Sequence, residues 1–89
     1  MNNFPLKGVS FRMLIYVNTV SGRKHQLEVE PTMTILAIKE ELQQREGIST
    51  PQQRLLFRGQ NLSDSQTVET AKIGAGEVLH MVLALRAGF

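Results

Sequence analysis

Residues 13–30 read MLIYVNTVSGRKHQLEVE, and this stretch determines the expected fold. Its first half is β-branched and aromatic, and its second half alternates polar with apolar side chains, which is typical of a β-hairpin with one buried face. Ser21-Gly22 supplies the tight turn, because Gly22 has no Cβ and can take a positive φ. Pro31 cannot donate to a sheet ladder and therefore ends the second strand.

An amphipathic helix is expected over residues 34–46. Thr34 is a suitable N-cap, since its hydroxyl can accept from a free backbone N–H in the first turn. The helix has one narrow apolar stripe at i, i+3 and i+7, which consists of Ile35, Ile38 and Leu42. Gly47 ends the helix as its C′ residue, and Pro51 prevents its continuation.

The rest of the chain adds strands to this hairpin and helix. Residues 54–58 are strand-like, residues 59–61 form a turn, and Leu62 begins a short return. Residues 68–72 indicate a brief helical turn. Residues 78–85 are apolar at nearly every position, which is typical of a central strand in contact on both faces. The expected class is α+β, with one main helix packed across a mixed sheet of about five strands.

Length and composition limit the function classes. A chain of 89 residues with 42% apolar side chains fits one small domain and excludes a two-domain enzyme. It has no cysteine, and hence no disulfide, thiolate metal site or cysteine nucleophile. The net charge of +2 forms no basic stripe, so nucleic acid is not an expected partner. The apolar runs are too short to span a membrane and residues 1–12 lack a signal-peptide core, so we expect a cytoplasmic and nuclear location.

Catalytic motifs are missing from the sequence. The G-x-S-x-G, P-loop and H-E-x-x-H patterns are absent, and the two histidines, His25 and His80, fall on separate expected strands. Glu40 and Glu41 are adjacent helical positions about 100° apart, which favours solvation over a general acid–base pair. We therefore expect no enzyme activity, no metal site and no cofactor.

Three segments are expected along the chain. Residues 1–12 form a flexible leader, because Asn, Pro and Gly punctuate them before the first strand. Residues 13–85 form the folded domain, and residues 86–89 form a flexible C-terminal tail.

Five blocks of the sequence resemble ubiquitin, and most closely the Nedd/Rub class of ubiquitin-like modifiers. The blocks are Met13-Leu14-Ile15, Glu28-Val29-Glu30-Pro31-Thr32, Arg45-Glu46-Gly47-Ile48, Pro51-Gln52-Gln53-Arg54-Leu55 and residues 78–86. They follow in the family's order without a gap between residues 13 and 88. The resemblance implies the ubiquitin-like β-grasp fold, in agreement with the element order above.

Ala84 indicates the Nedd-type pathway within that resemblance. Ubiquitin carries Arg at the matching position, whereas the Nedd/Rub class carries Ala. In the family this position helps an activating enzyme select its modifier, because a bulky cation without a counter-charge is penalised in the wrong enzyme.

The resemblance also implies two protein-binding patches. The first matches Val20, Leu56, His80 and Val82. Strand alternation supports it independently, because the neighbouring Leu55, Leu79 and Met81 are expected to face the core. The second patch matches Ile48, Leu83 and Leu85. The alternatives are scattered surface aliphatics for the first patch and partial burial at the sheet edge for the second.

The C-terminal tail departs from the family. The modifiers end in Leu-Arg-Gly-Gly, whose carboxylate is adenylated with ATP, passed to an enzyme cysteine and joined to a substrate lysine. Here the tail is Leu85-Arg86-Ala87-Gly88-Phe89. Gly88 matches the terminal glycine, and a processing hydrolase would remove Phe89. Ala87 replaces the other glycine, and its methyl group would hinder entry of the tail into an enzyme channel that accepts glycine.

The lysines at which ubiquitin builds chains are mostly replaced. Gln60 and Ala75 stand at the two most used positions, and Lys39 alone remains at a matching position as a candidate acceptor. Poor polymer formation is therefore expected.

The sequence leaves two functions open. The first is a conjugated modifier of the Nedd/Rub type, with activating and conjugating enzymes, a processing hydrolase and cullin-like or other protein targets as partners. The second is a non-conjugated ubiquitin-like module that binds ubiquitin-binding-type domains. A monomer is expected in both.

Overall fold

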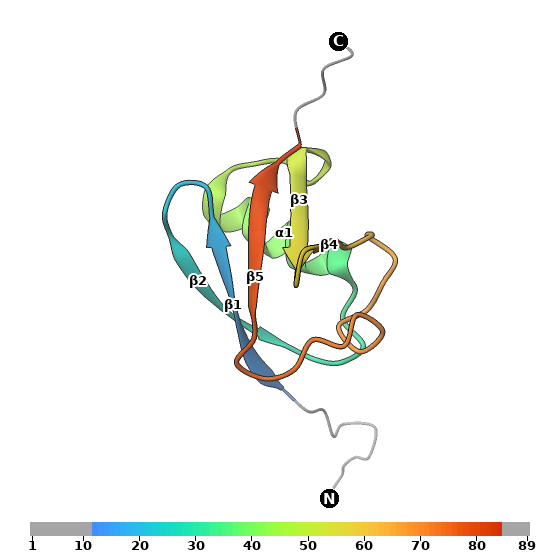
Figure 1. Ribbon diagram of the computed structural model, residues 1–89. Helices are drawn as coiled ribbons and strands as arrows, with labels where there is room; N and C mark the ends of the chain where they lie inside the picture. The colour runs from blue at the N-terminus through green and yellow to red at the C-terminus, as the bar shows by residue number, and fades with distance from the viewer. Residues whose placement is uncertain (1–11, 85–89) are drawn as a thin grey trace, which may run out of the picture.

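A computed structural model describes residues 12–84 of the chain. Its elements are β1 (Met13–Thr19), β2 (Lys24–Val29), α1 (Ile35–Glu46), a 3-10 turn (Thr50–Gln52), β3 (Gln53–Phe57), β4 (Gln60–Asn61) and β5 (Val78–Leu83). The strands form one sheet in the order β2-β1-β5-β3-β4, in which only the β1–β5 pair is parallel. The helix crosses one face of this sheet and leaves the other open (Figure 1). The expected β-grasp architecture is confirmed.

The β1–β2 hairpin has the predicted turn. The N–H of Thr19 donates to the carbonyl of Arg23 at 2.9 Å, and the N–H of Gly22 donates back to Thr19 at 3.0 Å. Gly22 has a φ of 87°, which a side chain with a Cβ rarely adopts. Beyond the turn the two strands stay in antiparallel register as far as the Met13–Val29 pair.

The α1 helix begins and ends at the predicted caps. Thr34 is the N-cap, and its hydroxyl accepts from the N–H of Ala37 at 3.1 Å. Gly47 is in the left-handed conformation with a φ of 76°, and its N–H donates to the carbonyl of Gln43 at 2.8 Å. Both arrangements satisfy backbone groups that a helix end leaves free.

The core lies between the helix and the sheet. Its buried apolar residues come from every main element and are Ile15, Val17, Leu27, Val29, Ile35, Ile38, Leu42, Leu55, Phe57, Leu62, Val68, Ile73, Leu79 and Met81. The expected helical stripe is thus fully buried. Each such side chain contributes roughly 1.5–3 kcal/mol to folding when it leaves water, which lets a cysteine-free domain stand on packing alone.

Four local expectations are wrong. β3 covers Gln53–Phe57 rather than 54–58, and the turn is confined to Arg58 and Gly59, which have φ values of 54° and 79°. The return strand therefore begins at Gln60 and not at Leu62. Residues 68–72 form hydrogen-bonded turns and no helix, because consecutive backbone bonds there change from an i→i−4 to an i→i−3 partner.

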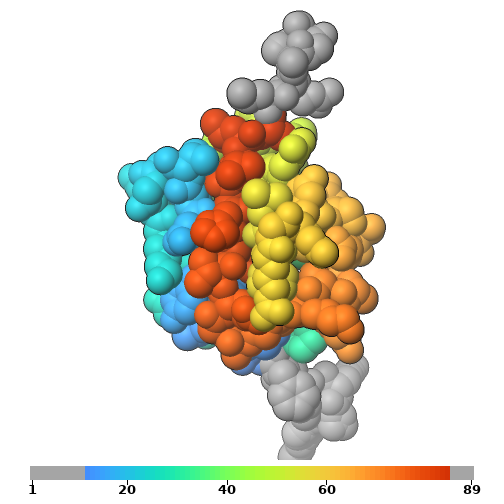
Figure 2. All heavy atoms as spheres, viewed as in Figure 1, coloured from blue at the N-terminus to red at the C-terminus, as the bar shows by residue number. Residues whose placement is uncertain are grey.

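β5 is central in the sheet, and its two faces differ as strand alternation predicted, whereas the contact on both faces expected from its apolar run is not observed. Leu79 and Met81 are buried against the helix side, whereas His80 is exposed on the opposite side. Figure 2 shows this open face, where β1, β5 and β3 lie side by side with no other described element over them. The run of apolar residues in β5 reflects a surface patch as well as the core.

The expected leader and tail fall largely outside the described residues. Arg12, the last residue of the expected leader, has its guanidinium 3.6 Å from Glu28 and 3.5 Å from Glu30. Residues 1–11 and 85–89 are not described.

Candidate functional site: the open face of the sheet

The first predicted patch comes together on the open sheet face. Leu56 and His80 are directly opposite each other in the β3–β5 pair. Val82 lies two residues along β5 on the same face and is half-buried, as is Leu56. Val20 is 57% exposed and directly follows Thr19, the last β1 residue paired with β5. Leu56, His80 and Val82 therefore share one face of two paired strands, and Val20 lies in the turn that follows the neighbouring β1; we call these four residues the sheet patch.

The sheet patch has a cationic rim. Arg54 is exposed and lies opposite Val82 in the β3–β5 ladder. The guanidinium of Arg58, at the end of the same strand, lies 3.0 Å from the carboxylate of Glu77. Arg58 is thus already paired with a carboxylate, and Arg54 is the rim cation that would suit an acidic side chain of a partner.

The turn that carries Val20 is tied to the end of α1 by Glu46. The hydroxyls of Thr19 and Ser21 donate to the Glu46 carboxylate at 3.2 and 3.3 Å. His25 Nε2 is 2.5 Å from the same carboxylate. The hydrogen bond from His25 lowers the pKa of Glu46, partial burial opposes this shift, and the Thr19 and Ser21 hydroxyls add to it.

The second predicted patch is only partly described. Leu83 is 43% exposed and lies opposite Gln53 at the end of the β3–β5 pair. The buried Gln53 side chain donates from Nε2 to the carbonyls of Ile48 and Lys39, both at 2.9 Å. Ile48 itself is half-buried against the core. Gln53 thus holds Ile48 and Leu83 at one end of the sheet, while Leu85 lies outside the described residues.

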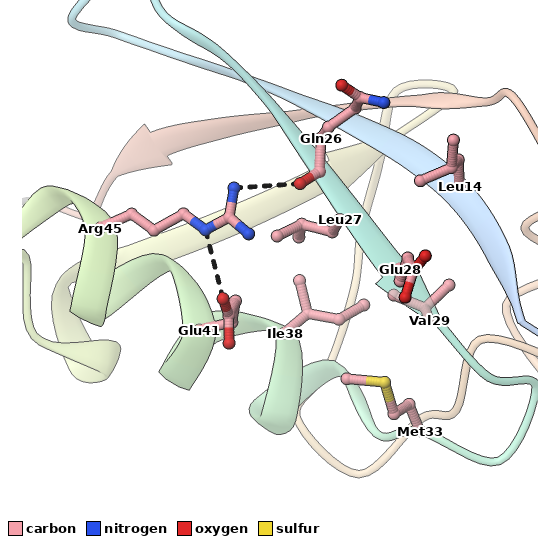
Figure 3. Close-up of a pocket in the computed structure, with 9 residues that line it drawn as sticks. All are labelled: Leu14, Gln26, Leu27, Glu28, Val29, Met33, Ile38, Glu41 and Arg45. Atoms are coloured by element: carbon pink, nitrogen blue, oxygen red, sulfur yellow. Dashed lines mark hydrogen bonds and ion pairs between the residues drawn. The ribbon is translucent and has the colours of Figure 1, made fainter.

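A cavity of about 320 Å³ lies between β2 and α1 (Figure 3). The side chain of Arg45 crosses its edge, where Nη1 donates to the carbonyl of Gln26 at 3.0 Å and Nε donates to Glu41 at 3.2 Å. β2 is an edge strand of the sheet, and the contact with Arg45 occupies the Gln26 carbonyl, one of its backbone acceptors. The cavity brings together no nucleophile and base that could catalyse a reaction.

Residues 12–84 contain neither a metal-binding cluster nor a membrane-spanning helix. No three His, Cys, Asp or Glu side chains within this range are grouped so as to hold a metal ion. The helix in the same range is too short to cross a membrane.

A family sequence model, described as the ubiquitin family, matches residues 15–86, in agreement with the fold. The chain belongs to the ubiquitin family. Ubiquitin-like protein NEDD8 of Dictyostelium discoideum is 43% identical over 76 residues, which cover 85% of this chain and 99% of that protein. NEDD8-like protein RUB1 of Saccharomyces cerevisiae is 40% identical, with the same shares covered. Ubiquitin domain-containing protein DSK2 of the same yeast is 37% identical over 79% of this chain, but this match covers only 19% of the longer protein.

In this ubiquitin-family domain the candidate acceptor Lys39 is packed on the buried side of α1. Its side chain is 9% exposed, and its ammonium lies 2.7 Å from the Asp64 carboxylate. An amine must be reachable and free of its ion pair before it can attack a thioester. The placement of Lys39 therefore weighs against its use as an acceptor.

The predicted pathway residue is the last described residue of the ubiquitin-family domain. Ala84 is partly exposed, and its N–H donates to the carbonyl of Gln52 at 2.7 Å. This bond fixes where the chain leaves the sheet. The predicted conjugation tail, consisting of Leu85, Arg86, Ala87 and Gly88, lies beyond it and outside the described residues.

Sequence reasoning missed the polar side chains that hold the patch residues in place. Glu46 and Gln53 appeared in the family blocks, yet neither was assigned a role. The signal for Glu46 was weak, because its partners Thr19 and His25 are 27 and 21 residues away. A polar residue such as Gln53 directly before an alternating strand offered a clearer hint of a buried amide.

Proposed function

We propose that this ubiquitin-family protein is a modifier of the Nedd/Rub type. Activation occurs at Gly88 after removal of Phe89, and the protein is then conjugated to lysines of target proteins. The observation that carries the proposal is the sheet patch, in which Leu56, His80 and Val82 share the open face of two paired strands and the exposed Val20 lies in the turn after the neighbouring strand. Apolar area of this kind on a small domain usually has a partner.

Two features of the chain support the modifier over other ubiquitin-like roles. The NEDD8-named relatives match over nearly their whole length, so the domain alone corresponds to a complete protein of that class. Ala84 lies at the exit of the chain from the sheet, where an activating enzyme would read it beside the tail. The proposed partners are activating and conjugating enzymes, a processing hydrolase and cullin-like targets in the cytoplasm and nucleus. The protein itself is proposed to act without catalysis.

The proposal is tested by expressing the chain with an N-terminal tag and searching for conjugates. We expect heavier tagged species that survive thiol treatment, because an isopeptide bond to lysine resists reduction. Deleting Gly88 and Phe89 together should remove these species, whereas deleting Phe89 alone should retain them. Equal patterns from both deletions would contradict conjugation through Gly88.

One observation favours a second candidate function. Ala87 replaces a tail glycine, and the match to DSK2 shows that such a domain can be a small part of a longer protein. A non-conjugated module would bind partners through the sheet patch and give no heavier species in either deletion. Its binding would still be lost in Leu56→Ala, which distinguishes it from an inactive domain.

A further inference from the structure

The β1–β2 turn is held by a contact that crosses the molecule. This turn, residues 19–23, connects two strands at the edge of the sheet, and Val20 is its exposed apolar residue. Glu46 is the last residue of α1, on the helix layer behind the sheet (Figure 1). The carboxylate of Glu46 therefore joins the end of the helix to the segment that presents Val20.

Three donors surround that carboxylate, and each lies at a different point of the turn. Thr19 ends β1, Ser21 lies inside the turn, and His25 belongs to β2 just beyond it. The side chains of Glu46 and His25 are only 6% and 13% exposed. Hydrogen bonds to an ionised group are stronger than neutral ones, and reduced access to water strengthens them further.

Val20 lies between two of the donors. Because Thr19 and Ser21 both bind Glu46, the backbone on either side of Val20 is fixed relative to the helix. Val20 itself remains 57% exposed between these two hydrogen-bonded residues. Without the carboxylate, the turn would keep two backbone bonds and the 2.7 Å contact between the Thr19 and Ser21 hydroxyls, but it would lose the hydrogen bonds that join it to the helix.

We propose that Glu46 and His25 are positioning residues for partner binding, because they lock the β1–β2 turn so that Val20 completes the sheet patch. This inference rests on the proposed role of the patch in binding. A partner then meets a surface that is ordered before contact, and it loses less conformational entropy on binding. The other patch positions are on β3 and β5 and do not depend on this lock.

Amide hydrogen exchange tests the lock without any partner. In Glu46→Leu, the turn amides of Thr19 and Gly22 should exchange about tenfold faster or more, which corresponds to the loss of about one charge-assisted hydrogen bond. Amides of β5 should be unchanged. Glu40→Leu is the matched control at an exposed position of the same helix, and Glu46→Gln should retain most of the protection because its amide oxygen still accepts. Unchanged turn amides in Glu46→Leu would overturn the lock.

A double-mutant cycle then tests the effect on binding, with a purified ubiquitin-binding domain as the probe. We expect Glu46→Leu to weaken binding about three- to tenfold, and to have little further effect once Val20 is replaced by Ala. Glu46→Gln should restore most of the affinity. An equal loss in the Val20→Ala background would overturn the positioning role, since Glu46 would then act on the whole domain. A probe that fails to bind the unmodified protein would contradict the binding role of the patch, while the exchange data would still decide whether the lock exists.

Discussion

Leu56 and His80 lie directly opposite each other on β3 and β5, on the sheet face that the helix leaves open. The adjacent pair in the same ladder, Leu55 and Met81, lies on the other face and is buried in the core. Consecutive positions of one strand therefore have different surroundings, since one side chain packs in the core and the next lies on the open face. Binding and stability should be separable by mutation at this place.

Leu56→Ala and Leu55→Ala form a matched pair that tests this separation. Leu56→Ala should weaken partner binding about tenfold or more and change the free energy of unfolding only slightly, because the side chain is half-exposed. Leu55 has no exposed surface, and its truncation should cost about 2–5 kcal/mol of stability. Urea unfolding and titration with a ubiquitin-binding domain measure the two effects. Normal affinity in Leu56→Ala would show that the sheet patch is not the binding surface.

Gln53→Glu should be strongly destabilising, although the two side chains have the same shape. The Gln53 amide donates to two backbone carbonyls in a buried site, and a carboxylate can donate to neither. Loss of both bonds together with a buried charge should cost about 3 kcal/mol or more. Gln52→Glu, at the exposed neighbouring position, should change stability by about 0.5 kcal/mol or less. Similar unfolding midpoints for the two variants would contradict the role assigned to Gln53.

The sequence predicted those features that depend on neighbouring residues. The turn at Gly22 and the caps at Thr34 and Gly47 each follow from the chemistry of one residue and its local backbone, and all three are confirmed. The short return strand was expected to begin at Leu62 but lies at Gln60–Asn61, because pairing with β3 forms it and these two residues have little strand preference of their own.

Long-range polar contacts could not be predicted in the same way. The Lys39–Asp64 ion pair spans 25 residues, and no local sequence pattern pairs these two side chains. Only the packing of the 62–67 segment against α1 brings the carboxylate near, through backbone bonds such as Leu36 N–H to the Asp64 carbonyl at 3.2 Å. The position of such a segment depends on the whole core and not on a local pattern.

Lys39 should be the slowest of the described lysines to react with an amine-acylating reagent. Lys24 and Lys72 are exposed, whereas Lys39 is nearly covered and ion-paired. We expect its labelling to be slower by about tenfold or more, because it requires local opening. Asp64→Ala should accelerate labelling at Lys39 alone, as followed by peptide mass spectrometry. Equal rates at all three lysines would restore Lys39 as an accessible acceptor.

The Glu46 contact should give stability a specific pH dependence. The pKa of Glu46 is lower in the folded state than in the unfolded chain, so the unfolded state binds the proton more readily as the pH falls. The stabilisation is therefore present above the ordinary glutamate pKa and is lost as the pH falls through the lowered value. The difference in unfolding free energy between the unmodified protein and Glu46→Gln should follow this curve. A difference that does not change with pH would contradict the charge-assisted contact.

The central claim is activation at Gly88, and a thioester assay tests it most directly. The intact chain, a form truncated after Gly88 and a truncated Ala87→Gly variant are each incubated with ATP and a Nedd-type activating enzyme. We predict a thiol-sensitive adduct from the truncated form, none from the intact chain, and faster formation with Ala87→Gly because the extra methyl is gone. Absence of an adduct from the truncated form would contradict activation at Gly88. If an adduct formed only with the truncated Ala87→Gly variant, the natural domain would serve in binding alone.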